Sequence, residues 1–192
     1  MTEKTRCTFM DGSKIYIDYH NNEWGRPVRD DAKLFEMLML ETMQAGLAWI
    51  TILNKREAFR QAFDGFDPHK IALYGDAKKQ ELMENAGIIR NRLKIEAAVH
   101  NAQIFLDITE KHGPFSDMLW SYVDNTSVIG NPKTLEDTPA TTPLSDKVSK
   151  DLKKMGFKFV GSTTIYAFLQ ATGIVNDHIV DCFVYEEILN GY

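Results

Sequence analysis

Apolar residues recur every three or four positions through most of this chain of 192 residues. From Asp30 to Phe63 the repeat predicts one or two helices with a buried stripe that includes Leu47. Asp30 or Asp31 is the expected N-cap, and Gly46 marks a break in the helix or a close approach of the backbone. Because three more stretches share the helical period, we expect helices at 77–85, 91–112 and 114–123.

Strand-like alternation is weak and occurs only over residues 15–19, which form a short run. The sequence therefore predicts an all-α fold. Residues 131–145 hold three of the six prolines and four threonines, and this composition predicts a loop or a linker between lobes. We expect one compact unit over residues 1–192, built from two helical lobes.

The overall composition is that of an ordinary globular protein. Hydrophobic residues make up 44% and charged residues 26%, which excludes a disordered or collagen-like chain. Apolar runs fall far short of the roughly 20 residues that span a bilayer, and the N-terminus has no apolar signal segment. Since the chain has only two cysteines, we expect a reduced, cytoplasmic setting without a disulfide scaffold or a membrane partner.

The charge balance limits how the chain could bind nucleic acid. Lys plus Arg number 22 and Asp plus Glu number 27, so the formal net charge is −5. A protein covered in positive charge for nonspecific binding would have the opposite sign. Any contact with DNA must therefore use basic residues that are gathered locally.

Both cysteines have a histidine nearby, and the two pairs stand near opposite ends of the chain. Cys7 and His20 form a C-x12-H pair, while His178 and Cys182 form an H-x3-C pair whose spacing, on a helix, would place both side chains on one face. Two thiolates and two imidazoles form a tetrahedral set that suits zinc, and four protein ligands indicate a structural site. The alternative is two unrelated buried cysteines and two surface histidines.

A glycine-bounded hairpin lies between the last two predicted helices. Ser145 is expected to cap the first helix, and the hairpin runs from Gly156 to Gly161. Ser162 and Thr163 stand where the second helix begins, so their free backbone N–H groups could bind an anion.

Lysines gather around this hairpin within twelve residues, at positions 147, 150, 153, 154 and 158. Nearby, only Asp146 and Asp151 oppose them. This arrangement suits contacts with DNA phosphates, which position a protein without reading the sequence. The alternative is a solvated face beside an ordinary turn between helices.

A carboxylate lies among aromatic residues in the first half of the chain. Glu41 stands in an apolar stretch at a spacing that suggests an inward orientation, and a buried carboxylate needs a partner or a ligand. Tyr19, Trp24 and Trp49 could stack on a flat cationic group beside it. The alternative is that the rings are core packing and that Glu41 pairs with a lysine or caps a helix.

Long blocks of the chain also resemble one family of DNA-repair enzymes. The blocks are YHNNEWG (19–25), KLFEMLMLETMQAGLAWITILNKREAFRQAF (33–63), AGIIRNRLKI (86–95), LKKMGFKFVGSTTIYAFLQATGIVNDH (152–178), and the Cys7, His20, His178 and Cys182 set. From roughly Cys7 to Cys182, the chain resembles the DNA-3-methyladenine glycosylase I (TAG) family. The resemblance implies a helix-hairpin-helix fold, with that motif at about 146–173.

The resemblance also implies roles for particular residues. Zn²⁺ would join the terminal segments through the Cys/His set, and Tyr19, Trp24, Glu41 and Trp49 would line the pocket for the base, with Glu41 as the catalytic residue. The implied contacts with DNA are Gln44, Gly46, Gly156, Lys158, Gly161, Ser162 and Thr163. Phe9 stands where a relative of the family has a tryptophan, and the tail after Cys182 also differs.

The implied activity is hydrolysis of the glycosidic bond of 3-methyladenine in alkylated double-stranded DNA, which leaves an abasic site and the free base. No lysine in the matching blocks stands out as a Schiff-base nucleophile, so we expect a monofunctional enzyme, and a monomer. Asp177, beside His178, is interpreted as a structural residue. Two alternatives stay open: a noncatalytic zinc-stabilised DNA-binding module, and a zinc hydrolase with water in place of one ligand.

Overall fold

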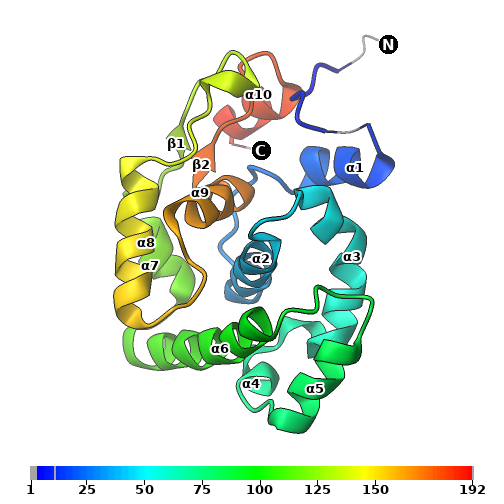
Figure 1. Ribbon diagram of the computed structural model, residues 1–192. Helices are drawn as coiled ribbons and strands as arrows, with labels where there is room; N and C mark the ends of the chain where they lie inside the picture. Colours follow the sequence, from blue (N-terminus) through cyan, green and yellow to red (C-terminus); the bar gives the residue numbers. More distant parts are fainter. Residues whose placement is uncertain (1–3, 11, 192) are drawn as a thin grey trace.

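The computed structural model describes residues 4–10 and 12–191 as a mainly helical protein (Figure 1). The helices are α1 (Lys14–Asn22), α2 (Asp31–Gln44), α3 (Trp49–Ala62), α4 (Pro68–Ile71), α5 (Asp76–Glu84), α6 (Arg92–His112), α7 (Phe115–Ser121), α8 (Pro143–Met155), α9 (Ser162–Ala171) and α10 (Phe183–Leu189). Short 3₁₀ turns occur at η1 (Asp64–Phe66) and η2 (Leu135–Asp137). Of the expected unit 1–192, residues 1–3, 11 and 192 lie outside this description.

The short alternating run at 15–19 is helical and lies inside α1. The structure instead has two short parallel strands, β1 (Val128–Ile129) and β2 (Val175–Asn176), which the sequence did not reveal. Each strand has only two residues, too few for alternation to be visible. The helices expected at 77–85, 91–112 and 114–123 are confirmed to within two residues as α5, α6 and α7.

Helix α2 occupies the centre of the fold, where it contacts α3, α6, α7 and α9. Nine of its residues are buried, in an unbroken run from Met37 to Met43 together with Leu34 and Phe35. The helix begins where the sequence predicted, because the side chain of Asp30 accepts a hydrogen bond from the Lys33 N–H at 2.8 Å. A helix that is apolar on nearly all sides is stable only when it is surrounded in this way.

Gly46 ends α2, as expected from the sequence. Its φ of +82° is a left-handed conformation that favours glycine. Leu47 is the exception to the predicted stripe, because it lies in the exposed turn between α2 and α3 and is 40% exposed. Lys94 of α6 stabilises this turn, because its ammonium group donates to the carbonyl oxygens of Met43 and Ala45, each at 2.8 Å.

Helices α8 and α9 pack as a pair across a short turn. The expected cap at Ser145 is wrong by three residues: Thr142 caps α8, and Ser145 completes the capping box from inside the helix. The segment 131–145 is therefore not all loop, since it contains η2 and the first turn of α8. Gly156 ends α8 in the left-handed conformation that the sequence suggested, with φ of +106°.

The segment that precedes α1 lies beside α10 at the other end of the chain (Figure 1). The Phe183 N–H donates to the carbonyl oxygen of Thr5 at 3.1 Å, and Lys4 pairs with Glu187 at 3.7 Å. In the part of the chain that the structure describes, no helix has the length and apolar character needed to cross a bilayer.

Candidate active site and metal centre

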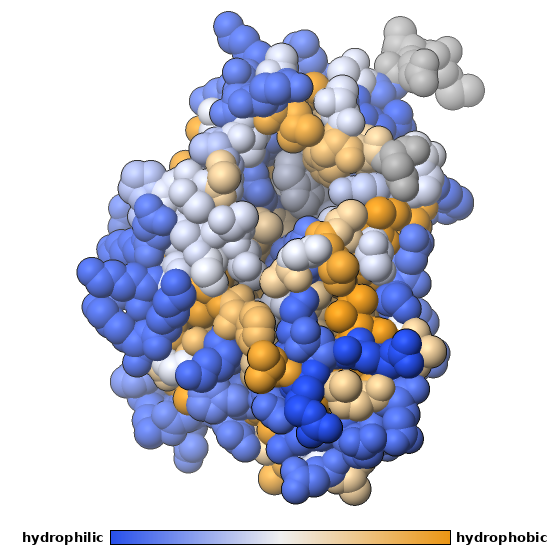
Figure 2. Space-filling view, in the orientation of Figure 1, coloured by the Kyte–Doolittle hydropathy of each residue, from blue (hydrophilic) through white to orange (hydrophobic). Residues whose placement is uncertain are grey.

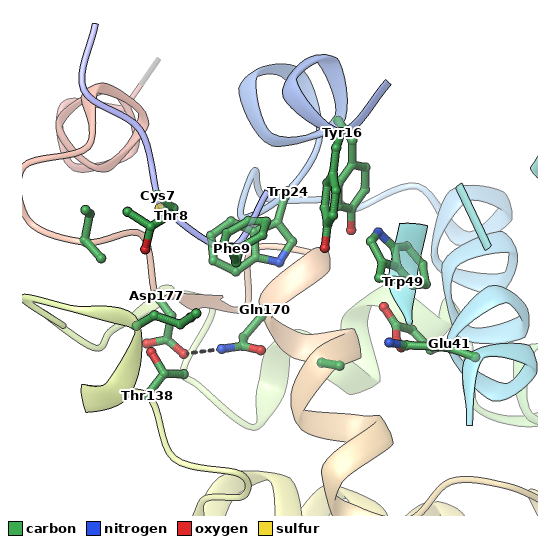
Figure 3. Close-up of a pocket in the computed structure, with 15 residues that line it drawn as sticks. Cys7, Thr8, Phe9, Tyr16, Trp24, Glu41, Trp49, Thr138, Gln170 and Asp177 are labelled. Carbon is green, nitrogen blue, oxygen red and sulfur yellow. Dashed lines mark hydrogen bonds between the residues drawn. The ribbon is translucent and has the colours of Figure 1, made fainter. Parts of the chain in front are cut away.

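A pocket of about 220 Å³ opens between α1, α2, α3 and α9 (Figure 3). All four residues that the sequence indicated for a base pocket line it: Tyr19, Trp24, Glu41 and Trp49. Gln44 lies at the same pocket, whereas Gly46 is not part of its lining. We refer to this cavity as the Glu41 pocket.

Glu41 faces inward because it continues the buried stripe of Leu34 and Leu38 along α2. Glu41 is 3% exposed, and no residue of the described chain donates a hydrogen bond to its carboxylate. Burial raises the pKa of Glu41 to about 8. The alternative that Glu41 pairs with a lysine or caps a helix is therefore wrong, because Glu41 makes no such contact with any described residue.

Aromatic rings form a continuous wall around this carboxylate. The rings of Tyr19 and Trp49 lie 5.6 Å apart and are tilted by 47°, and Phe9 meets Trp24 edge-on at 4.7 Å. Tyr16 connects the two pairs, 5.7 Å from Phe9 and 6.5 Å from Tyr19. Burial and the nearby Glu41 raise the pKa of Tyr19 well above its usual value, so it stays a neutral phenol.

The opposite side of the pocket holds a hydrogen-bonded group of three residues, of which the sequence singled out only Asp177. Asp177 is buried and accepts hydrogen bonds from the Tyr166 hydroxyl and, at 2.8 Å, from the side-chain amide nitrogen of Gln170. Since a carboxylate only accepts, the amide oxygen of Gln170 must face away from Asp177 (Figure 3). The one signal for Gln170 was a polar residue inside the apolar stretch of α9.

A buried ion network lies behind the aromatic wall and joins three helices. The guanidinium of Arg56 on α3 contacts Glu36 of α2 at 2.9 Å and Glu23, at the end of α1, at 2.8 Å. Burial alone would raise the pKa of Glu36, but Arg56 and Lys33 hold it below its usual value. Because Glu23 adjoins Trp24, this network fixes the aromatic wall relative to α2.

The four predicted metal ligands, Cys7, His20, His178 and Cys182, form one buried cluster beside the pocket. We refer to it as the Cys/His cluster. One candidate donor atom from each residue lies within 4.8 Å of all the others. The Sγ atom of Cys7 is 3.4 Å from Nδ1 of His178, and that of Cys182 is 3.5 Å from Nε2 of His20. Both histidines are buried, so the alternative of two surface histidines is wrong.

The donor set fits a metal ion because both imidazoles are held in the required tautomers. The His178 Nε2–H donates to the carbonyl oxygen of Trp24 at 2.9 Å, and Nδ1 of His20 lies 3.0 Å from the side-chain oxygen of Asn21. Each ring therefore turns its other nitrogen toward the thiols. Residues 178–182 are not helical: they form a turn, and Cys182 is the N-cap of α10.

The turn between α8 and α9 presents the remaining predicted residues at the surface. The side chain of Asn101 on α6 stabilises this turn through two hydrogen bonds to the backbone of Lys158. It accepts from the Lys158 N–H at 2.8 Å and donates to the Lys158 carbonyl oxygen at 3.0 Å. Lys158 and Thr163 are exposed, and Gly161 is the N-cap of α9, where no side chain caps the helix. A shallow groove beside Ser162 is lined by Lys150, Lys153 and Lys154.

Comparison with known proteins places this geometry in context. The methyladenine glycosylase family model matches residues 9–185. The chain is 48% identical over 180 residues to DNA-3-methyladenine glycosylase 1 of Escherichia coli (strain K12), covering 94% of this chain and 96% of that protein. It is 47% identical over 178 residues to DNA-3-methyladenine glycosylase of Haemophilus influenzae (strain ATCC 51907 / DSM 11121 / KW20 / Rd), covering 93% and 96%.

Solved structures of the same kind of protein have a similar fold. A crystal structure of 3-methyladenine DNA glycosylase I (TAG) superposes with a TM-score of 0.91 at 48% identity, covering 93% of this chain and 98% of that one. A variant of 3-methyladenine DNA glycosylase I (TAG) in complex with 3-methyladenine superposes with a TM-score of 0.90 at 38% identity, covering 93% and 96%.

Proposed function

Since the chain belongs to the methyladenine glycosylase family, whose members hydrolyse N-glycosidic bonds, we propose that it excises 3-methyladenine from alkylated double-stranded DNA. The observation that carries the proposal is the carboxylate of Glu41, which is buried without a partner among aromatic rings in a pocket. A buried group of this kind destabilises the fold and is retained where it meets a ligand.

The damaged nucleotide leaves the base stack and enters the Glu41 pocket. Trp49 and Tyr19 stack on the flat purine, and Trp24 with Phe9 closes the wall behind them. Glu41 accepts a hydrogen bond from the exocyclic amine and stabilises the positive charge of the methylated ring. The solved relative that contains 3-methyladenine supports this choice of ligand.

The methylated base is cationic, so its bond to the sugar is already weak. When that bond breaks, the bonding electrons go to the base, which departs as neutral 3-methyladenine. Water then adds to C1′ of the oxocarbenium-like sugar and loses one proton, leaving an abasic site. No lysine lines the pocket in the described part of the chain, and this supports a monofunctional enzyme that lacks Schiff-base chemistry.

The Cys/His cluster is suited to hold one Zn²⁺ through Cys7, His20, His178 and Cys182. The ion would supply a structural link between the two ends of the chain. Because four protein ligands leave no position for water, this assignment disfavours the alternative of a zinc hydrolase. The contacts of Asp177 with Tyr166 and Gln170 support a structural role for that residue.

DNA phosphates would meet the turn between α8 and α9 through Gly156, Lys158, Gly161, Ser162 and Thr163. Gln44 and Gly46 would approach the DNA where the nucleotide leaves the stack. We also propose that the helices act as one catalytic domain of two lobes and as a monomer.

The test is release of free base from alkylated duplex DNA, with Glu41→Gln as the matched control. The proposal expects the protein to release 3-methyladenine, and the variant to release it slowly while still binding the duplex. Duplex binding without base release by the wild-type protein would favour the noncatalytic DNA-binding module instead. Borohydride trapping of a covalent protein–DNA adduct would contradict the monofunctional mechanism.

A further inference from the structure

Most arginines of this acidic protein are engaged within the protein, but two are not. Five of the seven donate hydrogen bonds to protein acceptors: Arg6, Arg26, Arg29, Arg56 and Arg60. Arg90 and Arg92 are exposed, and neither has a hydrogen bond, an ion pair or a ring contact with any residue that the structure describes. A free guanidinium is suited to bidentate binding of phosphate.

Hydrogen bonds from neighbouring side chains hold the backbone of the segment that carries these arginines. The ammonium group of Lys55 on α3 donates to the carbonyl oxygens of Ala86 at 3.0 Å and Gly87 at 3.2 Å. The side chain of Asn91 caps α6 by accepting from the Lys94 N–H at 3.2 Å. Gly87 is packed so closely that a Cβ there would lie 2.9 Å from the Asn85 side-chain oxygen. The arginines therefore project from a rigid support, which lowers the entropy cost of binding.

The segment also adjoins the turn at the edge of the Glu41 pocket. Lys94, the last anchor of the segment, is the residue that holds the carbonyl oxygens of Met43 and Ala45. Gln44, between those two residues, lines the pocket. The free arginines are therefore only a few residues along the chain from a direct contact with the pocket edge.

On its other side the segment adjoins the turn between α8 and α9. Leu93, Lys158 and Phe159 line one shallow groove of about 410 Å³. Leu93 is 65% exposed and Phe159 is 38% exposed, so the groove places exposed apolar groups beside the exposed Lys158. On the face shown in Figure 2, exposed apolar residues lie among strongly polar ones below a hollow in the surface.

We propose that residues 90–93 form a further DNA-binding element, with Arg90 and Arg92 on backbone phosphates and Leu93 against the sugars. This inference rests on the proposed function, since it extends the same DNA surface across the pocket edge. Duplex DNA is the partner that fits, because it repeats negative charge at regular intervals and exposes apolar sugar faces between the phosphates. The carboxylate of Glu96, in the same groove, limits the basic surface on that side.

The experiment compares two double variants of equal net charge. Arg90→Gln/Arg92→Gln removes the free arginines, and Lys70→Gln/Lys111→Gln removes two exposed cations elsewhere. Each changes the formal charge from −5 by the same two positive charges. Lys111 stands on the same helix, α6, about 28 Å from Arg92 at 1.5 Å of rise per residue. Binding to duplex DNA is measured across a series of salt concentrations, together with binding of free 3-methyladenine.

We expect the arginine variant to bind duplex DNA about tenfold or more weakly than wild type, with a salt dependence shallower by about two in slope. Its affinity for free 3-methyladenine should equal that of wild type, since the pocket is untouched. The inference is overturned if the arginine variant binds duplex DNA with the affinity and salt dependence of wild type. It is also overturned if the lysine variant loses as much duplex affinity as the arginine variant. Base release by the wild-type protein is recorded separately, so failure of the proposed function is distinguishable from failure of this inference.

Discussion

The Cys/His cluster and the Glu41 pocket are both buried, and they share Trp24 as a common wall. The Trp24 ring lies 4.5 Å from the His178 ring on one side and lines the pocket on the other. Within the cluster, each ring nitrogen and each thiol lies within hydrogen-bonding reach of another protein atom. In the pocket, Oε2 of Glu41 and the indole N–H of Trp49 have none among the described residues.

This difference separates a structural role from a chemical one. A polar group that is satisfied by the protein itself contributes to folding, whereas an unsatisfied buried group costs about 1–3 kcal/mol. Removing a residue from the cluster should therefore lower stability first and activity only as a consequence. Removing a polar group from the pocket should lower activity while stability holds or improves.

The largest effect expected is on stability, from Cys182→Ala in the cluster. Losing one ligand should release the Zn²⁺ proposed for the cluster and lower the free energy of unfolding by about 4 kcal/mol or more, in the range of the most disruptive substitutions. Metal analysis and thermal unfolding measure both effects. Asp181→Ala, at the exposed neighbouring position, should keep the metal and the melting temperature. One metal ion per chain in the Cys182 variant would show that the cluster is wrongly assigned.

The next effect is on chemistry, from Glu41→Gln in the pocket. The cationic base favours the ionised form of Glu41, which is mostly protonated in the free protein at neutral pH. The amide keeps the shape but cannot ionise, so excision should fall about 10²- to 10³-fold, as when one electrostatic contact to the transition state is removed. Metal content should stay the same, and the melting temperature should hold or rise. Single-turnover excision, metal analysis and calorimetry test the three outcomes. Wild-type excision by the variant would exclude Glu41 as the recognition carboxylate.

The sequence predicted the residues of the Cys/His cluster and of the Glu41 pocket better than it predicted the local structure around them. A carboxylate in an apolar run and a Cys/His pair at each end are visible without coordinates. The turn at 178–182 and the place of Leu47 are not, because tertiary contacts override helical periodicity there. Gln170 was missed because its orientation depends on Asp177, seven residues away, across the bend that follows α9.

A smaller effect should appear in the pH dependence of stability. The pKa of Glu41 is about 8 in the folded protein, against about 4.3 in an unfolded chain. Between these values the folded state binds one more proton, so stability falls as the pH rises. From pH 6 to pH 8, wild type should lose about 2 kcal/mol relative to Glu41→Gln. Parallel denaturant titrations of the two proteins would reveal the divergence, and parallel pH curves would contradict it.

The smallest effect expected is that of Trp49→Phe, which tests whether the rings in the pocket act by stacking alone. Phenylalanine keeps an aromatic face toward the base but removes an indole N–H that has no acceptor among the described residues. Folding should therefore be unaffected, and the affinity for free 3-methyladenine should fall less than tenfold, since part of a stacking energy of about 1–3 kcal/mol is retained. Trp49→Ala removes the stack and should lose more. If the phenylalanine variant loses as much as the alanine variant, the indole N–H itself donates to the bound base, and Trp49 then resembles Glu41 as a polar group held unsatisfied for the ligand.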